Sequence, residues 1–270
     1  MYPYITFLTD FGLQDDFVGV CHGVIKRIVA DVSILDITHG IPPQAVLQGA
    51  LVLAQTIPYM PVGVHLAVVD PGVGGARRAL ALRDAEGRRY VGPDNGLLVP
   101  AAERNGGIAE ARELANPDYA LPSVSRTFHG RDLFAPAAAH LALGVPLEQL
   151  GPRIPIDTLV RLDLPEPRVA RDRIDATVLY VDRFGNMQLN LGRDDLERVG
   201  VVPGRRLELA ITSERYYAVA ARTFADARAG DIVLYEDAYR NVSIAINGGS
   251  AAAMFDAGPG TEIVIRLDLT

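Results

Sequence analysis

The chain has 270 residues, of which 49% are hydrophobic and 22% are charged, so it can form two modest domains and is too apolar for extended disorder. Its formal net charge of −7 argues against nucleic-acid binding, which needs a concentrated basic face. The single cysteine, Cys21, excludes an internal disulfide and is typical of a reducing cytosol. Neither a basic signal region nor an apolar run of about 20 residues is present, so we expect a soluble, cytoplasmic protein without a membrane partner.

The first half of the chain alternates short apolar strands with amphipathic helices. Strands are predicted at residues 5–9, 34–38, 65–70 and 90–93, and helices at 17–29, 45–57 and 133–143. Residues 81–90 are predicted to form a strand, a turn at 85–87 and a second strand. Such alternation is typical of a mostly parallel sheet that helices cover on both faces. We therefore expect a mostly parallel α/β sandwich domain over residues 1–154.

The second half of the chain has a different period. A charged stretch punctuated by prolines, residues 155–171, is predicted to be a linker. Beyond it, apolar residues alternate with polar ones, as at Leu207, Leu209 and Ile211 and again at Ile263, Ile265, Leu267 and Leu269. Short strands separated by turns indicate a small antiparallel barrel or sandwich over residues 172–270.

Polar residues follow several of the predicted strands, where ligands bind in parallel sheets. Asp10 follows the first strand, Asp70 and Arg77 follow the third, and His129 stands in the loop before a helix. A carboxylate, a guanidinium and an imidazole in such loops could together hold one water molecule. Asp10 could bind a ribose diol through two hydrogen bonds.

Each of these residues also has an ordinary structural explanation. Asp15 can be a helix N-cap and Asp16 a first-turn charge, and residues 70–72 and 94–96 can be plain turns. No Cys/His spacing suggests zinc, and the glycines of residues 72–75 match no dinucleotide or phosphate fingerprint. Structural roles are predicted for the other four histidines, which are His22, His39, His65 and His140.

Taken together, six motifs resemble the S-adenosyl-L-methionine hydroxide adenosyltransferases, relatives of the fluorinating and chlorinating enzymes that act on the same substrate. The motifs occur through nearly the whole chain in the expected order. They are Thr9-Asp10-Phe11-Gly12 with Asp15-Asp16, Asp70-Pro71-Gly72-Val73-Gly74 with Arg77, Pro93-Asp94-Asn95-Gly96-Leu97-Leu98, Phe128-His129-Gly130-Arg131-Asp132, Asp182-Arg183-Phe184-Gly185-Asn186 and Thr223-Phe224-Ala225-Asp226.

The resemblance implies an N-terminal α/β domain, a C-terminal antiparallel β-barrel and a homotrimer with active sites between neighbouring subunits. It implies that S-adenosyl-L-methionine is the small-molecule substrate and that neither a cofactor nor a metal takes part. Asp70, Arg77 and His129 correspond to the family's water-holding trio, and Asp10 to the residue that binds the ribose hydroxyls.

The resemblance also implies substrate contacts in both halves of the chain. Phe184 and Asn186 match adenine contacts, Phe224 matches a second aromatic beside the purine, and Asp182 corresponds to the contact of the methionine ammonium. The full set of implied substrate-binding residues is Asp10, Asp15, Phe128, Asp182, Phe184, Asn186, Phe224 and Ser243.

Departures from the halogenating relatives decide the predicted nucleophile. Asp70 replaces a tyrosine, Gly130 replaces a serine that helps to bind fluoride, and Gln44 replaces a tryptophan that lies against the substrate. The insertion that marks the fluorinating enzyme before Pro93 is missing. Because a carboxylate repels a halide and accepts water, we expect hydrolysis to adenosine and L-methionine.

The proton acceptor and three alternative functions stay open. His129, with an ordinary pKa near 6.5, is the better base at neutral pH, whereas Asp70, near 3.9, is better suited to orienting water. A calcium-dependent nucleoside hydrolase would also use a carboxylate-rich ribose site, but it leaves Arg77 and His129 without a role. A halogenase is disfavoured by Asp70 and Gly130, and a non-catalytic sensor by the complete trio.

Overall fold

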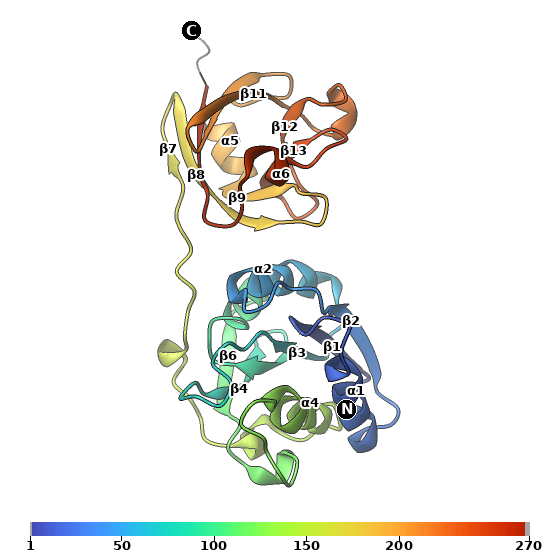
Figure 1. Cartoon of the computed structure of the whole chain (residues 1–270). Coiled ribbons are helices and arrows are strands. Elements are labelled where there is room, and N and C mark those ends of the chain that lie inside the picture. The colour runs from blue at the N-terminus through green and yellow to red at the C-terminus, as the bar shows by residue number, and fades with distance from the viewer. Residues whose placement is uncertain (1, 268–270) are drawn as a thin grey trace. The chain divides into compact units, whose positions relative to one another are not determined.

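The computed structural model describes residues 2–267 and divides the chain into two compact units, residues 1–162 and 163–270 (Figure 1). The segment predicted to be a linker is divided between them. Its first part belongs to the first unit, where the Val160 amide donates to Oδ1 of Asp94 over 2.9 Å. Its second part contains β7 (Arg168–Val169), which pairs with the next strand of the second unit.

The first unit contains a six-stranded sheet in the order β2-β1-β3-β5-β4-β6. Strands β2, β1, β3 and β5 are mutually parallel, and β4 runs antiparallel to both β5 and β6. The mostly parallel sheet predicted from the apolar runs is confirmed, although β3 ends two residues before Asp70. The strands are β1 (Tyr4–Thr9), β2 (Ser33–Thr38), β3 (Val64–Val68), β4 (Ala79–Asp84), β5 (Arg89–Pro93) and β6 (Ile108–Glu113).

Helices cover both faces of this sheet. Alternate residues of a strand point to opposite faces, so Leu66 packs in one buried cluster with α1 and α4, while Ala67 packs in another with α2 and α3. The predicted helix at 133–143 starts earlier, as a π-helical turn, η3 (Gly130–Phe134). The α-helices are α1 (Phe17–Ile28), α2 (Val46–Thr56), α3 (Val99–Arg104) and α4 (Ala135–Ala142), and the short 3₁₀ turns are η1 (Ile57–Tyr59), η2 (Pro117–Tyr119), η4 (Leu147–Leu150) and η5 (Ile156–Thr158).

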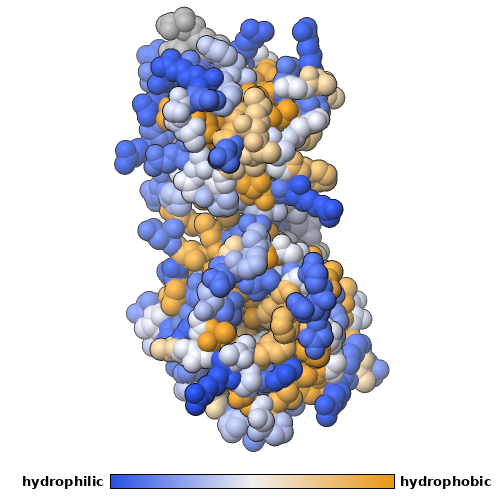
Figure 2. All heavy atoms as spheres, in the orientation of Figure 1, coloured by the Kyte–Doolittle hydropathy of each residue, from blue (hydrophilic) through white to orange (hydrophobic). Residues whose placement is uncertain are grey.

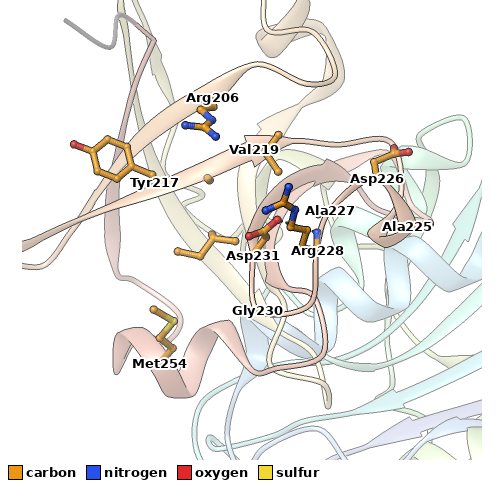
Figure 3. Close-up of a pocket in the computed structure, with 12 residues that line it drawn as sticks. Arg206, Tyr217, Val219, Ala225, Asp226, Ala227, Arg228, Gly230, Asp231 and Met254 are labelled. Carbon is orange, nitrogen blue, oxygen red and sulfur yellow. Dashed lines mark hydrogen bonds between the residues drawn. The ribbon is translucent and has the colours of Figure 1, made fainter.

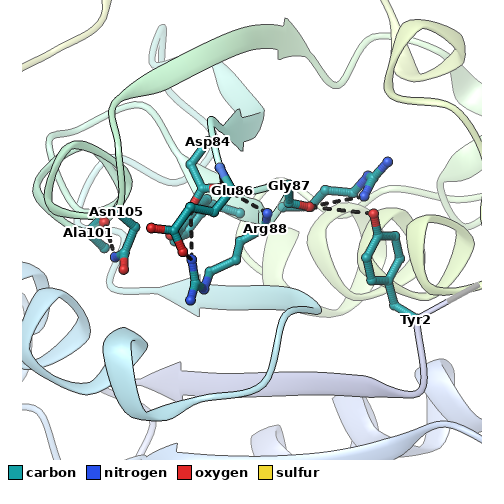
Figure 4. Close-up of polar contacts among 9 residues, drawn as sticks. Tyr2, Asp84, Glu86, Gly87, Arg88, Ala101 and Asn105 are labelled. Carbon is teal, nitrogen blue, oxygen red and sulfur yellow. Dashed lines mark hydrogen bonds and ion pairs between the residues drawn. The ribbon is translucent and has the colours of Figure 1, made fainter.

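The turn between β4 and β5 has the strand, turn and strand arrangement predicted from the sequence (Figure 4). The fully buried carboxylate of Asp84 organises it: Oδ1 accepts from the amides of Glu86 and Arg88, and Oδ2 accepts from the Tyr90 hydroxyl over 2.9 Å. The Arg88 side chain forms an ion pair with Glu86. A buried carboxylate that accepts this many hydrogen bonds stabilises a tight turn. The connection between β4 and β5 can therefore be short.

The second unit is a closed barrel of seven strands in the described part of the chain. The order β14-β10-β11-β12-β13-β9-β8 closes through pairing of β14 with β8, and only β11 and β12 pair in parallel. The predicted barrel is confirmed. Its strands are β8 (Arg173–Val181), β9 (Met187–Gly192), β10 (Arg206–Ile211), β11 (Glu214–Ala220), β12 (Ile232–Glu236), β13 (Asn241–Ile246) and β14 (Glu262–Arg266), with the helices α5 (Arg193–Arg198), α6 (Ala251–Phe255) and η6 (Phe224–Asp226).

Apolar and polar residues alternate along the strands of the second half, so each strand buries its apolar face in the barrel. Leu207, Leu209 and Ile263 are almost fully buried in its core. Leu269, the last residue of the predicted alternation, lies outside the described residues. On the visible face of each unit, hydrophilic and hydrophobic residues are interspersed (Figure 2). Among the described residues, no helix is both long and apolar enough to cross a membrane.

Candidate active site

Three of the predicted site residues meet beyond the carboxyl end of β3. Asp70 follows this strand, Arg77 stands two residues before β4, and His129 is the N-cap residue of η3. Arg77 Nε lies 3.0 Å from Oδ1 of Asp70, and Arg77 Nη2 forms an ion pair with Oδ2. The same Nη2 lies 2.9 Å from Nδ1 of His129. The fold therefore joins the trio through its central guanidinium.

The trio is well shielded from solvent. The side chains of Asp70 and Arg77 are 6% and 11% exposed, and the guanidinium lies over the ring of Phe134, 5.1 Å from its centroid. Burial and the Arg77 charge lower the pKa of His129, and the opposing effects of Asp70, Asp132 and the Ser125 backbone are smaller. His129 is therefore neutral at neutral pH.

The contact with Arg77 determines which nitrogen of His129 carries the proton. A guanidinium has only donors, so Nδ1 must accept and Nε2 must carry the proton of the neutral ring. A neutral His129 in this arrangement has no free lone pair with which to take a proton from water. This differs from the sequence expectation that the histidine is the better base.

A close approach of two loops holds the trio together. Gly74 has φ +75°, and a Cβ on it would lie 2.1 Å from the backbone oxygen of Arg126, three residues before His129. No side chain fits there, and an L-residue is also strained at this φ. Glycine at this position therefore lets the loop that carries Arg77 contact the loop that carries His129.

Two further residues position the trio and received no role in the sequence analysis. Asn95 donates from Nδ2 to the Val69 oxygen over 2.8 Å, directly before Asp70. Asp132 is fully buried and accepts the Ser125 amide over 2.8 Å, which holds the loop before His129. Both residues lie in motifs quoted for the resemblance. Their position in these motifs was the sequence feature that could have identified them.

Asp10 follows β1, the neighbour of β3, at the same edge of the sheet. Its Oδ2 accepts the backbone amide of Gln44 over 2.8 Å, and Gln44 has the unusual φ of +66°. One carboxylate oxygen of Asp10 is thus fixed by the backbone. Gln44 accordingly acts on Asp10 through its main chain.

The other predicted N-terminal contacts lie around the start of α1. Phe128 is partly buried and packs edge-on against Phe11 and Phe17, with ring centroids 5.7 and 5.2 Å apart. Asp15 is exposed in the loop before the helix. The N-cap residue is Asp16, and its side chain makes no capping hydrogen bond, so the capping explanation for Asp15 is wrong by one residue.

Gly130 is packed against the same aromatic residues. A Cβ on it would lie 3.0 Å from Cζ of Phe11 and 3.4 Å from Cε2 of Phe128. A serine at this position would press on both rings. Glycine at position 130 therefore fits the aromatic packing of this chain.

In the second unit, three predicted residues line one cavity of about 210 Å³. Asp182 and Asn186 come from the turn between β8 and β9, and Ser243 comes from β13. The Ser243 hydroxyl is buried and donates to Oδ2 of Asp237 over 3.2 Å. The remaining walls, which the sequence analysis did not identify, are Tyr180, Gln188, Tyr235, Asp237, Ala238 and Tyr239.

The hydrogen bonds of Asp182 belong mainly to its own turn. Its Oδ1 accepts the amides of Phe184 and Asn186, and its Oδ2 accepts the Asn186 side chain over 2.7 Å. The Asn186 side chain is thereby oriented, and its oxygen can still accept. Phe224 packs on the cavity residue Tyr235, with ring centroids 5.0 Å apart, whereas Phe184 is 76% exposed.

A larger hollow of about 730 Å³ lies elsewhere on the barrel (Figure 3). Its lining includes Arg206, Tyr217, Arg228, Asp231 and Met254, and none of the predicted site residues. Ala225 and Asp226, which also line this hollow, belong to one of the motifs quoted for the resemblance.

The fold and these two sets of residues define a two-domain protein, an α/β unit with a buried carboxylate–guanidinium–imidazole trio followed by a β-barrel with a small polar cavity. The chain belongs to the S-adenosyl-L-methionine hydroxide adenosyltransferase family. The family's N-terminal domain matches residues 5–151, and its C-terminal domain matches residues 176–264. The predicted resemblance is confirmed.

Known proteins similar to this chain include both hydrolases and halogenases. The chain is 48% identical to an (R)-S-adenosyl-L-methionine hydrolase of Salinispora tropica, over 97% of each chain. It is 30% identical to a fluorinase of Nocardia brasiliensis, over 98% of this chain and 97% of that one. A crystal structure of an uncharacterized conserved protein from Thermotoga maritima superimposes with a TM-score of 0.91 at 36% identity, covering 97% of this chain and 99% of the other.

Proposed function

We propose that this protein is a hydrolase that splits S-adenosyl-L-methionine into adenosine and L-methionine by attack of water on the ribose C5′. The observation that carries the proposal is the contact that Asp70 and His129 both make with Nη2 of the shielded Arg77 guanidinium. The similarity to curated hydrolases, which exceeds that to the fluorinases, supports the same conclusion. The single buried Cys21 supports a cytoplasmic location.

The leaving group of this reaction needs little help from the protein. C5′ is bonded to a sulfonium, so methionine leaves as a neutral thioether and no general acid is required. The difficulty is the nucleophile, because water has a pKa near 15.7. An in-line displacement therefore depends on placing one water opposite the sulfur, and such positioning supplies about 7–11 kcal/mol in the best intramolecular cases.

The geometry divides the roles within the trio. Arg77 donates twice to Oδ2 of Asp70 and once to Oδ1, so Oδ1 keeps a lone pair with which Asp70 accepts a hydrogen bond and finally the proton from water. Arg77 fixes the carboxylate, and burial together with the Arg77 charge lowers the pKa of His129 and keeps it neutral. His129 orients Arg77 through Nδ1. The carboxylate also repels halide anions, which favours water over fluoride or chloride as the nucleophile.

The prefix (R) in the name of the Salinispora relative indicates which stereoisomer of the substrate that enzyme accepts. The adenosyl group and L-methionine define every chiral carbon, so the label (R) refers to the one stereocentre left, the pyramidal sulfonium. We assign the same preference to this chain. An enzyme that removes only this sulfonium epimer would spare the other one, which explains how a cell can contain an enzyme that destroys this compound.

The substrate contacts are divided between the two units, which supports an active site shared between subunits of a homotrimer. The ribose residue Asp10 and the trio lie in the first unit, whereas Asn186 and Phe224 lie in the second. Phe184 exposes 76% of its surface, as expected for a residue that a ligand or a neighbouring subunit covers. A closed ring formed by repeated heterologous contacts would pair the first unit of one subunit with the second unit of the next.

The test is product analysis with each sulfonium epimer in ¹⁸O-labelled water. We expect adenosine and L-methionine from the (R) epimer, with the label in the adenosine 5′-hydroxyl. Activity should survive EDTA and should not increase with fluoride or chloride. Adenine as a product would indicate a nucleoside hydrolase, and unlabelled adenosine or halogenated adenosine would refute the proposed nucleophile.

A further inference from the structure

A second cluster of polar side chains lies at the carboxyl end of β2, apart from the trio. It consists of His22 on α1, Asp36 on β2 and His39, which directly follows this strand. His22 Nε2 lies 2.9 Å from Oδ1 of Asp36, and His39 Nε2 lies 3.2 Å from the same oxygen. One donor atom from each residue therefore faces a common point, and all three atoms lie within 4.8 Å of one another.

These separations are those expected of ligands on one small metal ion. Zinc bonds to histidine nitrogen and carboxylate oxygen are about 2.0–2.2 Å long, so two ligands of a tetrahedral ion lie about 3.3–3.5 Å apart. The distances of 2.9 and 3.2 Å need only a small outward movement. The side chains of His22 and Asp36 are 31% and 41% exposed, which permits this movement and leaves water access to the remaining positions.

A simple hydrogen-bonded pair explains only part of the cluster. His22 donates to Asp36 with normal geometry. The Nε2 atom of His39, however, is buried and has no hydrogen-bond partner of normal geometry in the described part of the chain, although it points into the cluster. The His39 side chain is only 3% exposed. A buried polar nitrogen without a partner costs stability, and a cation at this point would satisfy it.

The surroundings of His39 hold its ring in a metal-binding orientation. Thr9 Oγ1 lies 2.8 Å from Nδ1, and such a contact at the second ring nitrogen is usual for a metal-bound histidine. The ring also packs edge-on against the fully buried Phe7, whose ring lies near His22 as well.

We propose that His22, Asp36 and His39 bind one divalent transition-metal ion, with zinc as the best match to two imidazoles and one carboxylate. The ion has a structural role and leaves the chemistry at Asp70 unchanged. The Gly12 amide donates to the His39 oxygen over 2.8 Å, and Thr9 directly precedes Asp10. Metal binding would therefore stiffen the loop that carries Asp10. The proposal does not depend on the reaction proposed above.

The test is titration of untagged, EDTA-treated protein with cobalt(II) chloride, which gives visible d–d absorption when nitrogen ligands bind. We expect saturation at one equivalent, displacement by zinc and a higher melting temperature with zinc. His22→Ala and Asp36→Asn should each weaken cobalt binding at least tenfold. His140→Gln, which replaces a histidine on α4, should bind as the wild type does.

Paramagnetic broadening by cobalt provides a measurement that needs no variant. The NMR signals of His22 and His39 in the wild-type protein should broaden first. The absence of saturable binding in the wild type, equal binding by His22→Ala and Asp36→Asn, or first broadening at other residues would each overturn the proposal.

Discussion

Nδ1 of His129 accepts a hydrogen bond from Nη2 of Arg77 over 2.9 Å, so the histidine is held as the neutral tautomer with its proton on Nε2. We predict that the pKa of His129 lies below 6.5 and that Arg77→Met raises it, because the variant removes both the donor and the positive charge. Histidine NMR titrations with long-range ¹⁵N correlations check both the pKa and the tautomer. An unchanged pKa in Arg77→Met would contradict this arrangement.

Substitutions in the trio and substitution of Asp10 should affect different kinetic parameters. Asp70→Ala and His129→Ala should lower kcat about 10²-fold or more with little effect on substrate affinity, because they act on the nucleophile and its support. Asp10→Ala should instead weaken binding of both substrate and adenosine. Steady-state kinetics and calorimetry with adenosine separate these effects. If His129→Ala lost adenosine affinity and kept a normal kcat, the roles would be wrongly assigned.

The close approach at Gly74 predicts a loss of activity that a control glycine does not share. Gly74→Ala would place Cβ 2.1 Å from the Arg126 oxygen, so the loop with Arg77 must move away from His129. We expect a 10- to 100-fold lower kcat, since a displacement of about 1 Å is enough for such losses. Gly107→Ala is the matched control, because Gly107 has φ +91° and open space around its Cβ.

Both variants carry the strain of an L-residue at positive φ, about 1–2 kcal/mol, so their melting temperatures show how much of the effect is general destabilisation. Equal kcat in Gly74→Ala and Gly107→Ala would show that the loop contact does not matter for the reaction.

His65 predicts acid instability of the first unit. It is fully buried, with Nδ1 2.9 Å from Thr6 Oγ1, and burial lowers its pKa from 6.5 to about 3. The unfolded chain therefore binds a proton that the folded chain does not between these values. Its contribution to stability is complete above pH 6.5 and is lost as the pH falls towards 3, with a slope of about 1.4 kcal/mol per pH unit.

Urea unfolding between pH 7 and pH 4 measures this slope. His65→Gln should reduce this slope by about 1.4 kcal/mol per pH unit relative to the wild type. An identical slope in His65→Gln and the wild type would show that His65 is not the group responsible.

Subunit mixing tests the proposed shared site. His129→Ala and Asn186→Ala should each be inactive, because the first unit is defective in one and the second unit in the other. If the two are unfolded and refolded together at a one-to-one ratio, a site built from two neighbours has intact halves in about a quarter of cases. A site contained within one chain would recover no activity, so zero recovery from demonstrably mixed trimers would refute sharing.

Local patterns in the chain predicted the mostly parallel α/β sheet and a second unit that is a barrel or a sandwich, and the resemblance decided for the barrel. The apolar runs of the first half and the alternation at Leu207 and Leu209 depend on strand geometry alone, which repeats every two residues whatever the strand packs against. The positions of Asp10 and Asp70 after strands followed from the same patterns, because a parallel sheet brings the carboxyl ends of its strands to one edge.

The hydrogen-bond partners of the polar side chains, by contrast, are determined only by the tertiary structure. Neither the Arg77 contact that turns His129 from a free base into a hydrogen-bonded acceptor nor the turn that occupies the Asp182 carboxylate has a periodic signature. His22, Asp36 and His39 are separated in the sequence and converge only because α1 packs beside β1 and β2. Side-chain hydrogen bonds depend on distances of about 3 Å and on angles, and only the packed backbone determines these.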